Sequence, residues 1–209
     1  MNHKILIKYI YYTYMINLPN HIFFTGAPGS RWSGIAQTIE SISGFNTSDR
    51  NPNREYLHNT YSGHKGIYFG RGMECECITN GDYIDRQWAE PGGTKLIKSH
   101  EWAFHLTDIR EKEQWKDSWA MMVYRPDMAC YSWWHEAGGF NIKYPCYDAY
   151  KDSNTMLTEI IKQNAAILAY GKINNCKWEY FTSSWISENF GIEIPVTKVW
   201  PDILVTLIK

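Results

Sequence analysis

Short apolar runs alternate along the chain with segments whose apolar residues recur every three to four positions. Residues 22–25 form the first run and predict a short buried strand, and residues 33–42 follow it with helical spacing. Residues 94–102 predict a strand that ends in polar residues, and residues 118–124 predict a fully buried strand. A strand, a loop and a helix therefore open the fold, and further strands follow.

The second half of the chain contains the clearest helical pattern. Pro126 and Gly138 bracket a short helix, because proline suits a first helical turn and glycine a helix end. Residues 154–170 predict an amphipathic helix, residues 176–181 a final strand, and residues 183–191 a capped helix. Strands that alternate with helices predict an α/β fold with a mainly parallel sheet, in which ligands bind at the carboxyl ends of the strands.

Composition limits the possible partners. The chain has 209 residues, which favours a single domain over residues 1–209, and its formal net charge of −1 gives no global attraction to nucleic acid or to an anionic membrane. Five cysteines without a zinc-ribbon spacing fit a reducing compartment, so we expect a cytoplasmic protein. Residues 1–20 lack the small-residue cleavage site of a signal peptide and predict a strand or an amphipathic lead-in.

The stretch "FFTGAPGSRWSG", residues 23–34, lies between the first predicted strand and the first predicted helix. Glycine allows close backbone approach and positive φ, while a following helix presents unpaired N–H groups and the positive end of its dipole. Such a unit predicts an anion site, most often for phosphate. Tight turns need glycine and proline with or without a ligand, so the polar clusters at the later strand ends favour binding over a purely structural turn.

Together with those clusters, the loop resembles the first motif of the sulfotransferase family, whose members use 3′-phosphoadenosine 5′-phosphosulfate (PAPS). That motif, often written PKSGTTW, opens the helix after the first strand. Its places are taken here by Pro28, Gly29, Ser30, Arg31, Trp32 and Ser33. The resemblance implies a P-loop-like three-layer sandwich with a mainly parallel central sheet, and it implies that this loop binds the 5′-phosphosulfate end of PAPS.

Three downstream segments extend the resemblance in the family's order. "YRPDMACYSWWH" is similar to the family's RxPxDVAVSYYH motif, which implies that Arg125 and Ser132 bind the 3′-phosphate. "LIKSHEW" is similar to the KTH stretch, which implies that His100 is the general base, with Glu101 as the reserve base. "KWEYFTSSWISENFGI" looks like the "YEDL…IAEFLG" region of the family. The four segments span roughly residues 22–192.

Two positions depart from the family pattern. Gly29 stands where the family has a basic residue, so Arg31 and Lys98 are the candidates to neutralise the leaving phosphate. The spacing from Arg125 to Ser132 is one residue shorter than usual, which corresponds to a rotation of about 100° on a helix. Tyr131 is then the alternative occupant of the serine's place.

The resemblance implies sulfuryl transfer from PAPS to a hydroxyl acceptor, a small molecule or a glycan, without a metal ion. The product of the donor is 3′-phosphoadenosine 5′-phosphate (PAP). Such a transfer needs an in-line nucleophile, a base for the acceptor hydroxyl and positive charge at the leaving oxygen. His100 suits the base, because the unperturbed pKa of histidine is about 6.5. Arg31 and Lys98 would supply the positive charge.

Other residue types are less informative. Four tryptophans are either core residues or an aromatic wall for the acceptor: Trp88, Trp102, Trp133 and Trp134. Cys75 and Cys77 with His64 fall short of a four-ligand zinc pattern, so we expect no metal. Residues 46–90 and 138–150 are expected to shape the acceptor site, but no pattern in them identifies the acceptor, and the oligomeric state is unknown.

Two alternatives remain. "GAPGSRWS" has the length of the nucleotide-binding pattern GxxxxGK[ST] of P-loop kinases, although Arg31 stands at its second glycine and Trp32 at its lysine. A relative that binds PAP or another nucleotide but no longer transfers a group is the other alternative, because the usual basic residue is missing at Gly29.

Overall fold

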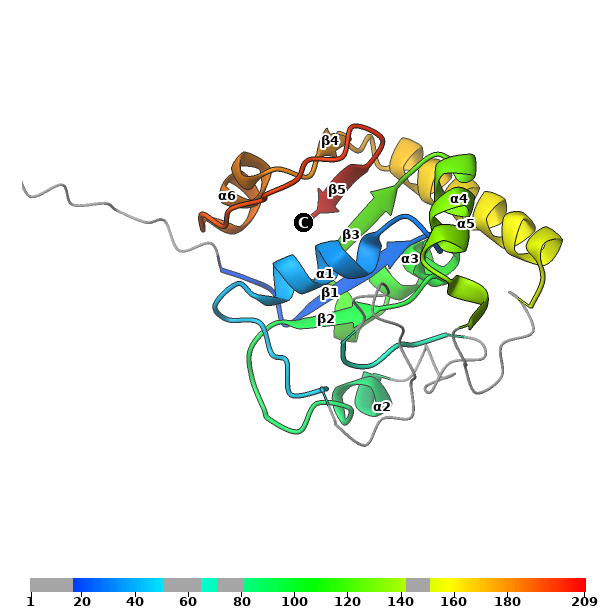
Figure 1. The fold of residues 1–209 in the computed structure, drawn as a ribbon. Coiled ribbons are helices and arrows are strands. Elements are labelled where there is room, and N and C mark those ends of the chain that lie inside the picture. Colours follow the sequence, from blue (N-terminus) through cyan, green and yellow to red (C-terminus); the bar gives the residue numbers. More distant parts are fainter. Residues whose placement is uncertain (1–16, 51–64, 71–80, 142–150) are drawn as a thin grey trace, which may run out of the picture.

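The computed structural model describes residues 17–50, 65–70, 81–141 and 151–209. Its centre is one open sheet of five strands in the order β2-β1-β3-β5-β4 (Figure 1). The strands are β1 (His21–Gly26), β2 (Lys95–Lys98), β3 (Trp119–Tyr124), β4 (Glu179–Tyr180) and β5 (Leu204–Ile208). The chain therefore has the mixed α/β character that the alternating pattern predicts.

The strands in the centre of the sheet run parallel. β1 pairs with β2 on one side and with β3 on the other, so that Phe24 lies opposite both Lys98 and Met121. β5 is antiparallel to β3, and β4 is antiparallel to β5. The expectation of a mainly parallel sheet is confirmed for the centre, whereas the β5–β4 edge is antiparallel.

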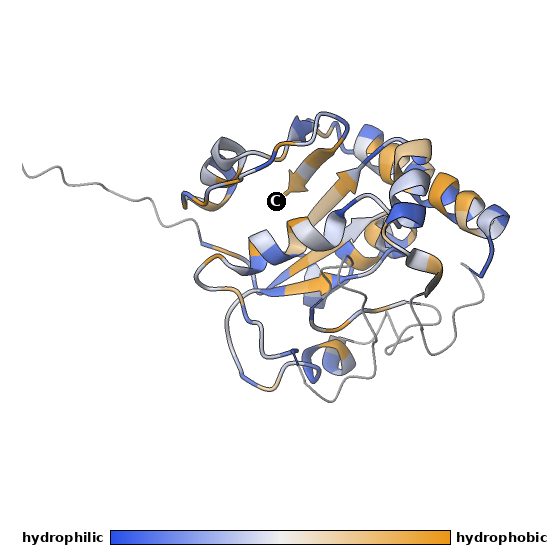
Figure 2. Ribbon diagram, in the orientation of Figure 1, coloured by the Kyte–Doolittle hydropathy of each residue, from blue (hydrophilic) through white to orange (hydrophobic). Residues whose placement is uncertain are grey.

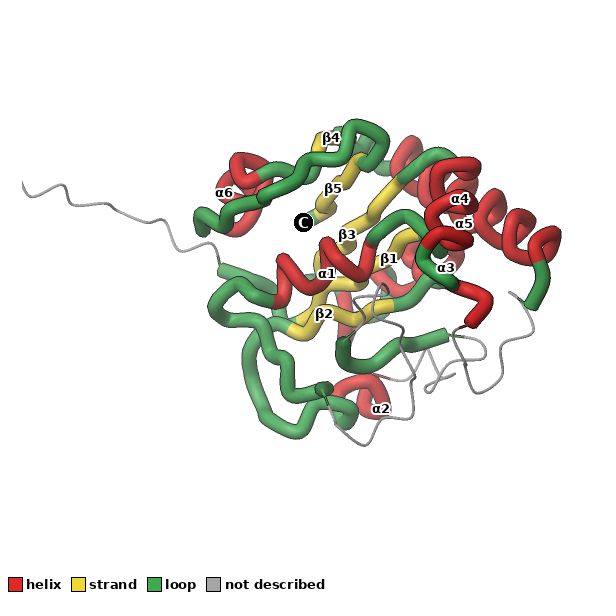
Figure 3. The backbone as a smooth tube through the Cα atoms, viewed as in Figure 1, coloured by secondary structure: helices red, strands yellow, loops and turns green. Residues whose placement is uncertain are grey.

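Six α-helices of the described residues surround the sheet (Figure 3). They are α1 (Trp32–Glu40), α2 (Gly81–Asp85), α3 (Trp102–Arg110), α4 (Asp127–Glu136), α5 (Ser153–Ile173) and α6 (Ser183–Phe190). The Asp152 carboxylate accepts hydrogen bonds from the first turn of α5, and the Thr182 hydroxyl accepts one from the Trp185 N–H at the start of α6. Gly191 ends α6 with φ of 70°, as the sequence predicts for a glycine helix end.

Apolar side chains from both faces of the sheet form two cores. One face packs against α1 and α6 through residues such as Phe24, Ile39 and Trp185. The other face packs against α3 and α5 through residues such as Phe23 and Leu106. Figure 2 shows hydrophobic colours on the strands between these helices. The sheet is thus the middle of three layers, because successive side chains of a strand point to opposite faces.

Two element predictions were confirmed only in part. The strand predicted over residues 94–102 ends at Lys98, and Trp102 begins α3, whose buried residues share one helical face. The segment over residues 176–181 is not the final strand, because β5 follows it and fills the place between β3 and β4. β5 is short and only partly buried at both ends, so its apolar run alone did not predict a strand beside β3.

The connections that leave the carboxyl ends of the strands diverge between β1 and β3. α1 follows β1 on one face of the sheet and leads to β2, whereas α3 follows β2 on the opposite face and leads to β3. After β3 the chain continues away from β1, toward β4 and β5. Ligands of open α/β sheets bind outside the carboxyl ends of the strands where the connections diverge in this way.

Candidate anion-binding site

Residues 27–31 connect β1 to α1 in a tight turn beside the point where the connections diverge. Gly29 has φ of 79°, and a Cβ atom built on it would overlap the carbonyl oxygen of Cys130 in α4. Glycine is therefore required here on both conformational and steric grounds. Arg31 precedes α1 with φ of 63°, a left-handed conformation that costs an L-residue about 1 to 2 kcal/mol.

Several hydrogen-bond donors of this loop have no acceptor within the described ranges of the chain. Within the turn, the Ser30 N–H donates to the Ala27 carbonyl oxygen at 3.0 Å. No hydrogen bond among the described residues engages the N–H groups of Gly29, Arg31 or Ser33. The Ser30 hydroxyl is fully buried and also has no hydrogen-bond partner there. A buried hydroxyl without a partner is costly, and unpaired N–H groups at a helix start attract anions.

His100 lies beside the loop, two residues after the end of β2. Its Nδ1 lies 2.5 Å from the Gly26 carbonyl oxygen, and its ring packs 4.3 Å from the Trp32 ring, measured between centroids. Because a carbonyl oxygen only accepts, Nδ1 carries the proton and Nε2 is the basic nitrogen of the ring. Burial lowers the pKa of His100 to about 4, although the hydrogen bond to Gly26 opposes part of this shift. The side chain is therefore neutral near pH 7.

Arg125 lies on the other side of the loop, directly after β3. Its Nη1 donates to the Gly29 carbonyl oxygen at 3.1 Å, and its Nε donates to the Asp202 carboxylate at 2.7 Å. The residue is 8% exposed. No hydrogen bond of Nη2 is present among the described residues. The carboxyl ends of β1, β2 and β3 thus bring the loop, His100 and Arg125 together.

Arg31 presents an unusual environment for a cation. Its Cζ lies 3.9 Å from the Trp133 ring centroid and 3.8 Å from the Trp200 ring centroid, so the guanidinium bridges two indoles. No described residue accepts a hydrogen bond from this guanidinium or forms an ion pair with it. Burial, and then the nearby charge of Arg125, lower the pKa of Arg31. Its faces are covered by two indoles, while its N–H groups have no acceptor in the part of the chain that the structure describes.

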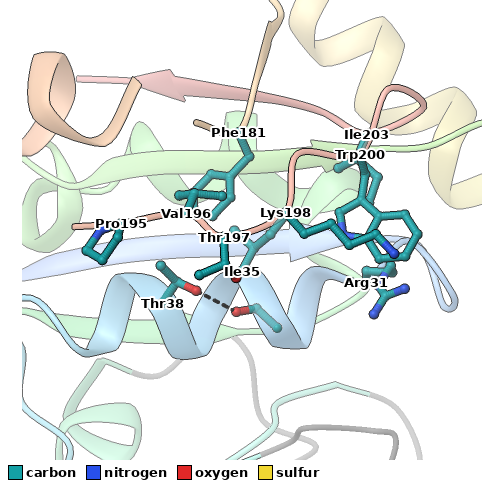
Figure 4. A pocket seen from close by; sticks show the side chains of 11 residues that line it. Arg31, Ile35, Thr38, Phe181, Pro195, Val196, Thr197, Lys198, Trp200 and Ile203 are labelled. Carbon is teal, nitrogen blue, oxygen red and sulfur yellow. Dashed lines mark hydrogen bonds between the residues drawn. The ribbon is translucent and has the colours of Figure 1, made fainter. Parts of the chain in front are cut away.

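A cleft of about 230 Å³ continues from Arg31 along α1. Figure 4 shows Arg31, Trp200 and Lys198 at one end of this cleft and Phe181 farther along it. The Lys198 Nζ lies 3.7 Å from the Trp200 ring centroid. The cleft is lined by Arg31, Gly34, Ile35, Thr38, Phe181, Pro195, Val196, Thr197, Lys198, Trp200 and Ile203. Its lining contains two cations and no carboxylate.

The structure does not bring Lys98 to the loop. Its ammonium forms an ion pair with the carboxylate of Glu40, the last residue of α1, and lies 3.6 Å from the Asp49 carboxylate. All three side chains are at most 2% exposed. Since α1 begins at Trp32, this ion pair lies about 12 Å along the helix from the loop, at 1.5 Å per residue. Lys98 therefore belongs to a buried cluster of charged side chains. The Arg50 guanidinium, 2.9 Å from the Glu40 carboxylate, is part of the same cluster.

The remaining expected site residues have different positions. Pro28 is buried in the turn, and Ser33 is half-buried in the first turn of α1. The Trp32 ring is 3% exposed and stacks on the Phe24 ring in the core, so only the backbone of Trp32 belongs to the loop surface. Ser132 is exposed on α4. The Tyr131 ring contacts the His135 ring at 4.6 Å between centroids.

The acceptor side is only partly described. Glu101 precedes α3, and its N–H donates to the Ser99 hydroxyl at 3.0 Å. Trp88, Trp102 and Trp134 are buried, so of the four tryptophans considered for an aromatic wall, three belong to the core and Trp133 contacts Arg31. Much of the expected acceptor region lies outside the described residues, as do His64, Cys75 and Cys77. In the described ranges no three His, Cys, Asp or Glu side chains are grouped for a metal ion.

Sequence motifs missed the segment between α6 and β5. It contributes Lys198, Trp200 and Asp202: Lys198 and Arg31 contact the Trp200 ring, and Asp202 accepts a hydrogen bond from Arg125. Its letters "KVWPD" place a cation, an aromatic ring and a carboxylate close together before an apolar run. That combination was the available signal, but it has no periodicity and no sequence feature relates it to residue 31 or 125.

Comparison with known proteins adds no relative. No protein-family model matches the chain, and no curated protein and no solved structure matches it. None of the helices that the structure describes combines the length and the apolar composition of a bilayer crossing.

Proposed function

We propose that the protein is a sulfotransferase that uses PAPS and a P-loop-like site to modify a hydroxyl acceptor, a small molecule or a glycan. One observation carries the proposal: the β1–α1 loop has unpaired donors and is bracketed by His100 at Gly26 and Arg125 at Gly29. The family resemblance gives this cluster its chemistry. The low number of cysteines and the free thiols of Cys130 and Cys176 support a cytoplasmic location.

The loop fits the 5′ end of the donor. The unpaired N–H groups of Gly29, Arg31 and Ser33 and the buried Ser30 hydroxyl match the many acceptor oxygens of a phosphosulfate. Arg31 takes the charge-neutralising role that a lysine has in the family motif. Its planar fork binds two oxygens at once, whereas an ammonium acts as a point charge. Lys98 has no part in this proposal, because its charge is already matched by Glu40.

Arg125 is proposed to bind the 3′-phosphate through the edge of its guanidinium that carries Nη2. Its other donors are fixed by Gly29 and Asp202, which orients the remaining N–H groups. Ser132 lies on the following helix, α4, and is exposed, and the family resemblance assigns it to the same phosphate. Charge-assisted hydrogen bonds of this type contribute about 1.5 to 3 kcal/mol each.

His100 is proposed to be the general base. PAPS supplies a sulfuryl group bound to a stable leaving phosphate. The Nε2 atom of His100 takes the proton of the acceptor hydroxyl while the acceptor oxygen bonds to sulfur and the bond from sulfur to the phosphate oxygen breaks. The charge left on that oxygen is stabilised by the loop N–H groups and Arg31. The low pKa keeps His100 unprotonated, and a bound anion raises that pKa toward neutrality.

The kinase alternative fits this loop less well. A P-loop kinase places a lysine at the position of Trp32, where the indole is instead buried between the rings of Phe24 and Tyr68. A second candidate function is PAP binding without transfer. It is favoured by the ion pair of Lys98, which leaves Arg31 as the single motif cation at the 5′ end.

Calorimetric titration with PAP in metal-free buffer tests the proposal. We expect micromolar binding by the wild type, a loss of about 30-fold or more in Arg125→Ala and no change in Lys116→Ala. The control removes an exposed lysine that precedes β3, at the opposite end of the sheet. Binding of ATP with Mg²⁺ in place of PAP contradicts the proposal and supports the kinase. PAP binding without PAPS turnover on a panel of hydroxyl acceptors supports the second candidate.

A further inference from the structure

One short segment contacts both arginines of the proposed site. Trp200 and Asp202 lie between α6 and β5, two residues apart. The Trp200 ring lies against the Arg31 guanidinium, and the Asp202 carboxylate accepts the Nε hydrogen of Arg125. Neither residue belongs to a motif that suggested the site. The segment therefore reaches the loop from outside the β1–α1 unit and the β3–α4 unit.

Asp202 determines which edge of Arg125 remains for a ligand. A guanidinium has five N–H donors in one plane. The bond from Nε to Asp202 and the bond from Nη1 to the Gly29 carbonyl fix that plane by two points, at 2.7 and 3.1 Å. One N–H of Nη2 points the same way as the Nε hydrogen, toward the side of Asp202, and the other lies at the end of the guanidinium between Nη1 and Nη2, where an anion can accept it. Without Asp202 the guanidinium is free to rotate about the Gly29 contact, and the side-chain entropy lost on anion binding rises.

Trp200 holds Arg31 in a corresponding way. The Arg31 guanidinium lacks any hydrogen bond to the described residues, so the contacts with Trp200 and Trp133 are what fix its position. An indole face attracts a cation but uses none of its N–H donors. Lys198 lies on the same Trp200 ring and adds a positive charge near the cleft. Trp200 thus positions a cation without neutralising it.

We infer that Asp202 and Trp200 are positioning residues of the nucleotide site, with Asp202 acting through Arg125 on the 3′-phosphate and Trp200 acting through Arg31 on the 5′-phosphate. The inference rests on the proposed function. It assigns different consequences to two residues of one segment. Asp202 governs the preference for a nucleotide with a 3′-phosphate, and Trp200 governs the affinity for any nucleotide with a 5′-phosphate.

Two nucleotides separate these roles. PAP carries both phosphates, and adenosine 5′-phosphate lacks the 3′-phosphate. For Asp202→Ala we expect a loss of about 10-fold in PAP affinity and less than 2-fold in adenosine 5′-phosphate affinity, with Asp202→Asn restoring most of the loss because it keeps an acceptor oxygen. For Trp200→Ala we expect both affinities to fall about 5-fold, with recovery in Trp200→Phe.

Asp85→Ala is the matched control. The Asp85 carboxylate also accepts a hydrogen bond from a cation, Lys95, which lies at the start of β2 and therefore away from the proposed site. The Asp85 side chain is 44% exposed, compared with 33% for Asp202. We expect it to leave both affinities unchanged. Circular dichroism melting identifies variants that fail to fold, and in that event Asp202→Leu, which also lacks an acceptor oxygen, and Trp200→Leu, which also lacks an aromatic face, carry the test with the same expected losses.

The outcomes separate the inference from the proposed function. Wild-type PAP binding with equal losses for PAP and adenosine 5′-phosphate in Asp202→Ala overturns the inference and leaves the proposed function standing. Unchanged affinities in both Asp202→Ala and Trp200→Ala do the same. No binding of either nucleotide by the wild type overturns both.

Discussion

The two ends of α1 carry cations in opposite electrostatic settings. At the carboxyl end, Lys98 is buried among Glu40, Asp49 and Arg50, so that two carboxylates face two cations. At the amino end, Arg31 contacts two indoles and forms no ion pair with any carboxylate that the structure describes. Both cations come from stretches that the sequence motifs assign to catalysis. Only the cation at the amino end lies beside unpaired loop donors.

The comparison distinguishes Lys98, whose charge is paired within the protein, from Arg31, whose charge and N–H donors can serve a ligand. Burying Lys98 without its acids would be costly, and the pairs remove that cost by using its charge within the protein. Arg31 keeps its charge and its N–H donors, although burial lowers its pKa and its backbone is left-handed. A residue held in a strained conformation beside unpaired donors is typical of a binding site.

Among the substitutions that test the two ends of α1, the replacement of Lys98 has the largest expected effect on the free energy of unfolding. Lys98→Met removes the ammonium that pairs with the buried carboxylates of Glu40 and Asp49, and we expect the free energy of unfolding to fall by about 3 to 5 kcal/mol in urea titrations. Lys116→Met removes an exposed pair with Glu113 and should cost less than about 0.5 kcal/mol. Equal effects of the two substitutions would show that Lys98 is not the structural member of the comparison.

His100, which is buried beside the loop, makes the free energy of unfolding depend on pH, and this effect is similar in size to that of Lys98→Met. The pKa of His100 is about 4 in the folded state and about 6.5 in the unfolded state, so between these values the unfolded state binds the extra proton. The contribution of His100 is complete above pH 6.5 and is lost as the pH falls toward 4, by roughly 3 kcal/mol in total.

His100→Gln should remove that part of the slope while the other titrating groups remain. The measurement is the free energy of unfolding of both proteins from pH 7.5 to pH 4.5. Parallel curves would mean that His100 titrates normally, and that its burial beside Gly26 is not maintained in solution.

Two substitutions of Arg31 separate the stability cost of its left-handed backbone from its role in PAP binding. In Arg31→Gly the left-handed conformation is relaxed, whereas Arg31→Ala retains the strain, so we expect the glycine variant to be more stable by about 1 kcal/mol in thermal unfolding. Both variants lack the guanidinium and should bind PAP equally weakly. A stable alanine variant with full PAP affinity contradicts both halves of the prediction.

The smallest expected effect comes from the unpaired hydroxyl. Ser30→Ala removes a buried hydroxyl that has no partner among the described residues, so we expect the unliganded protein to be stabilised by up to about 1 kcal/mol. PAP affinity should fall about 3- to 10-fold, since one hydrogen bond to the nucleotide is lost. A Ser33→Ala variant, which alters a half-buried hydroxyl of the same loop, is the comparison for stability. Loss of stability in Ser30→Ala would indicate a structural role.

Local patterns predicted much of the fold. The first strand and helix, the helix after Pro126 and the capped helix ending at Gly191 were confirmed, because proline, glycine and capping side chains act within one turn. β5 was missed because its position depends on pairing with β3, about eighty residues earlier. Pairing partners at that separation are determined by the tertiary structure and not by the local sequence.

Part of the site could also be predicted from the sequence. The loop, His100 and Arg125 follow strand ends, and parallel strands bring those ends together. The ion pair of Lys98 was not predictable, because Glu40 and Asp49 carry no feature that distinguishes them from surface acids. The absence of a basic residue at Gly29 has a steric explanation, the contact with Cys130, that only the structure reveals.

Titration of PAP into Arg31→Ala and Lys98→Met, in parallel with the wild type and without metal ions, tests the central comparison most directly. We expect at least about 10-fold weaker binding in Arg31→Ala and wild-type affinity in the folded fraction of Lys98→Met. If Lys98→Met loses PAP binding while Arg31→Ala keeps it, the available charge lies at the other end of α1 and the account is contradicted.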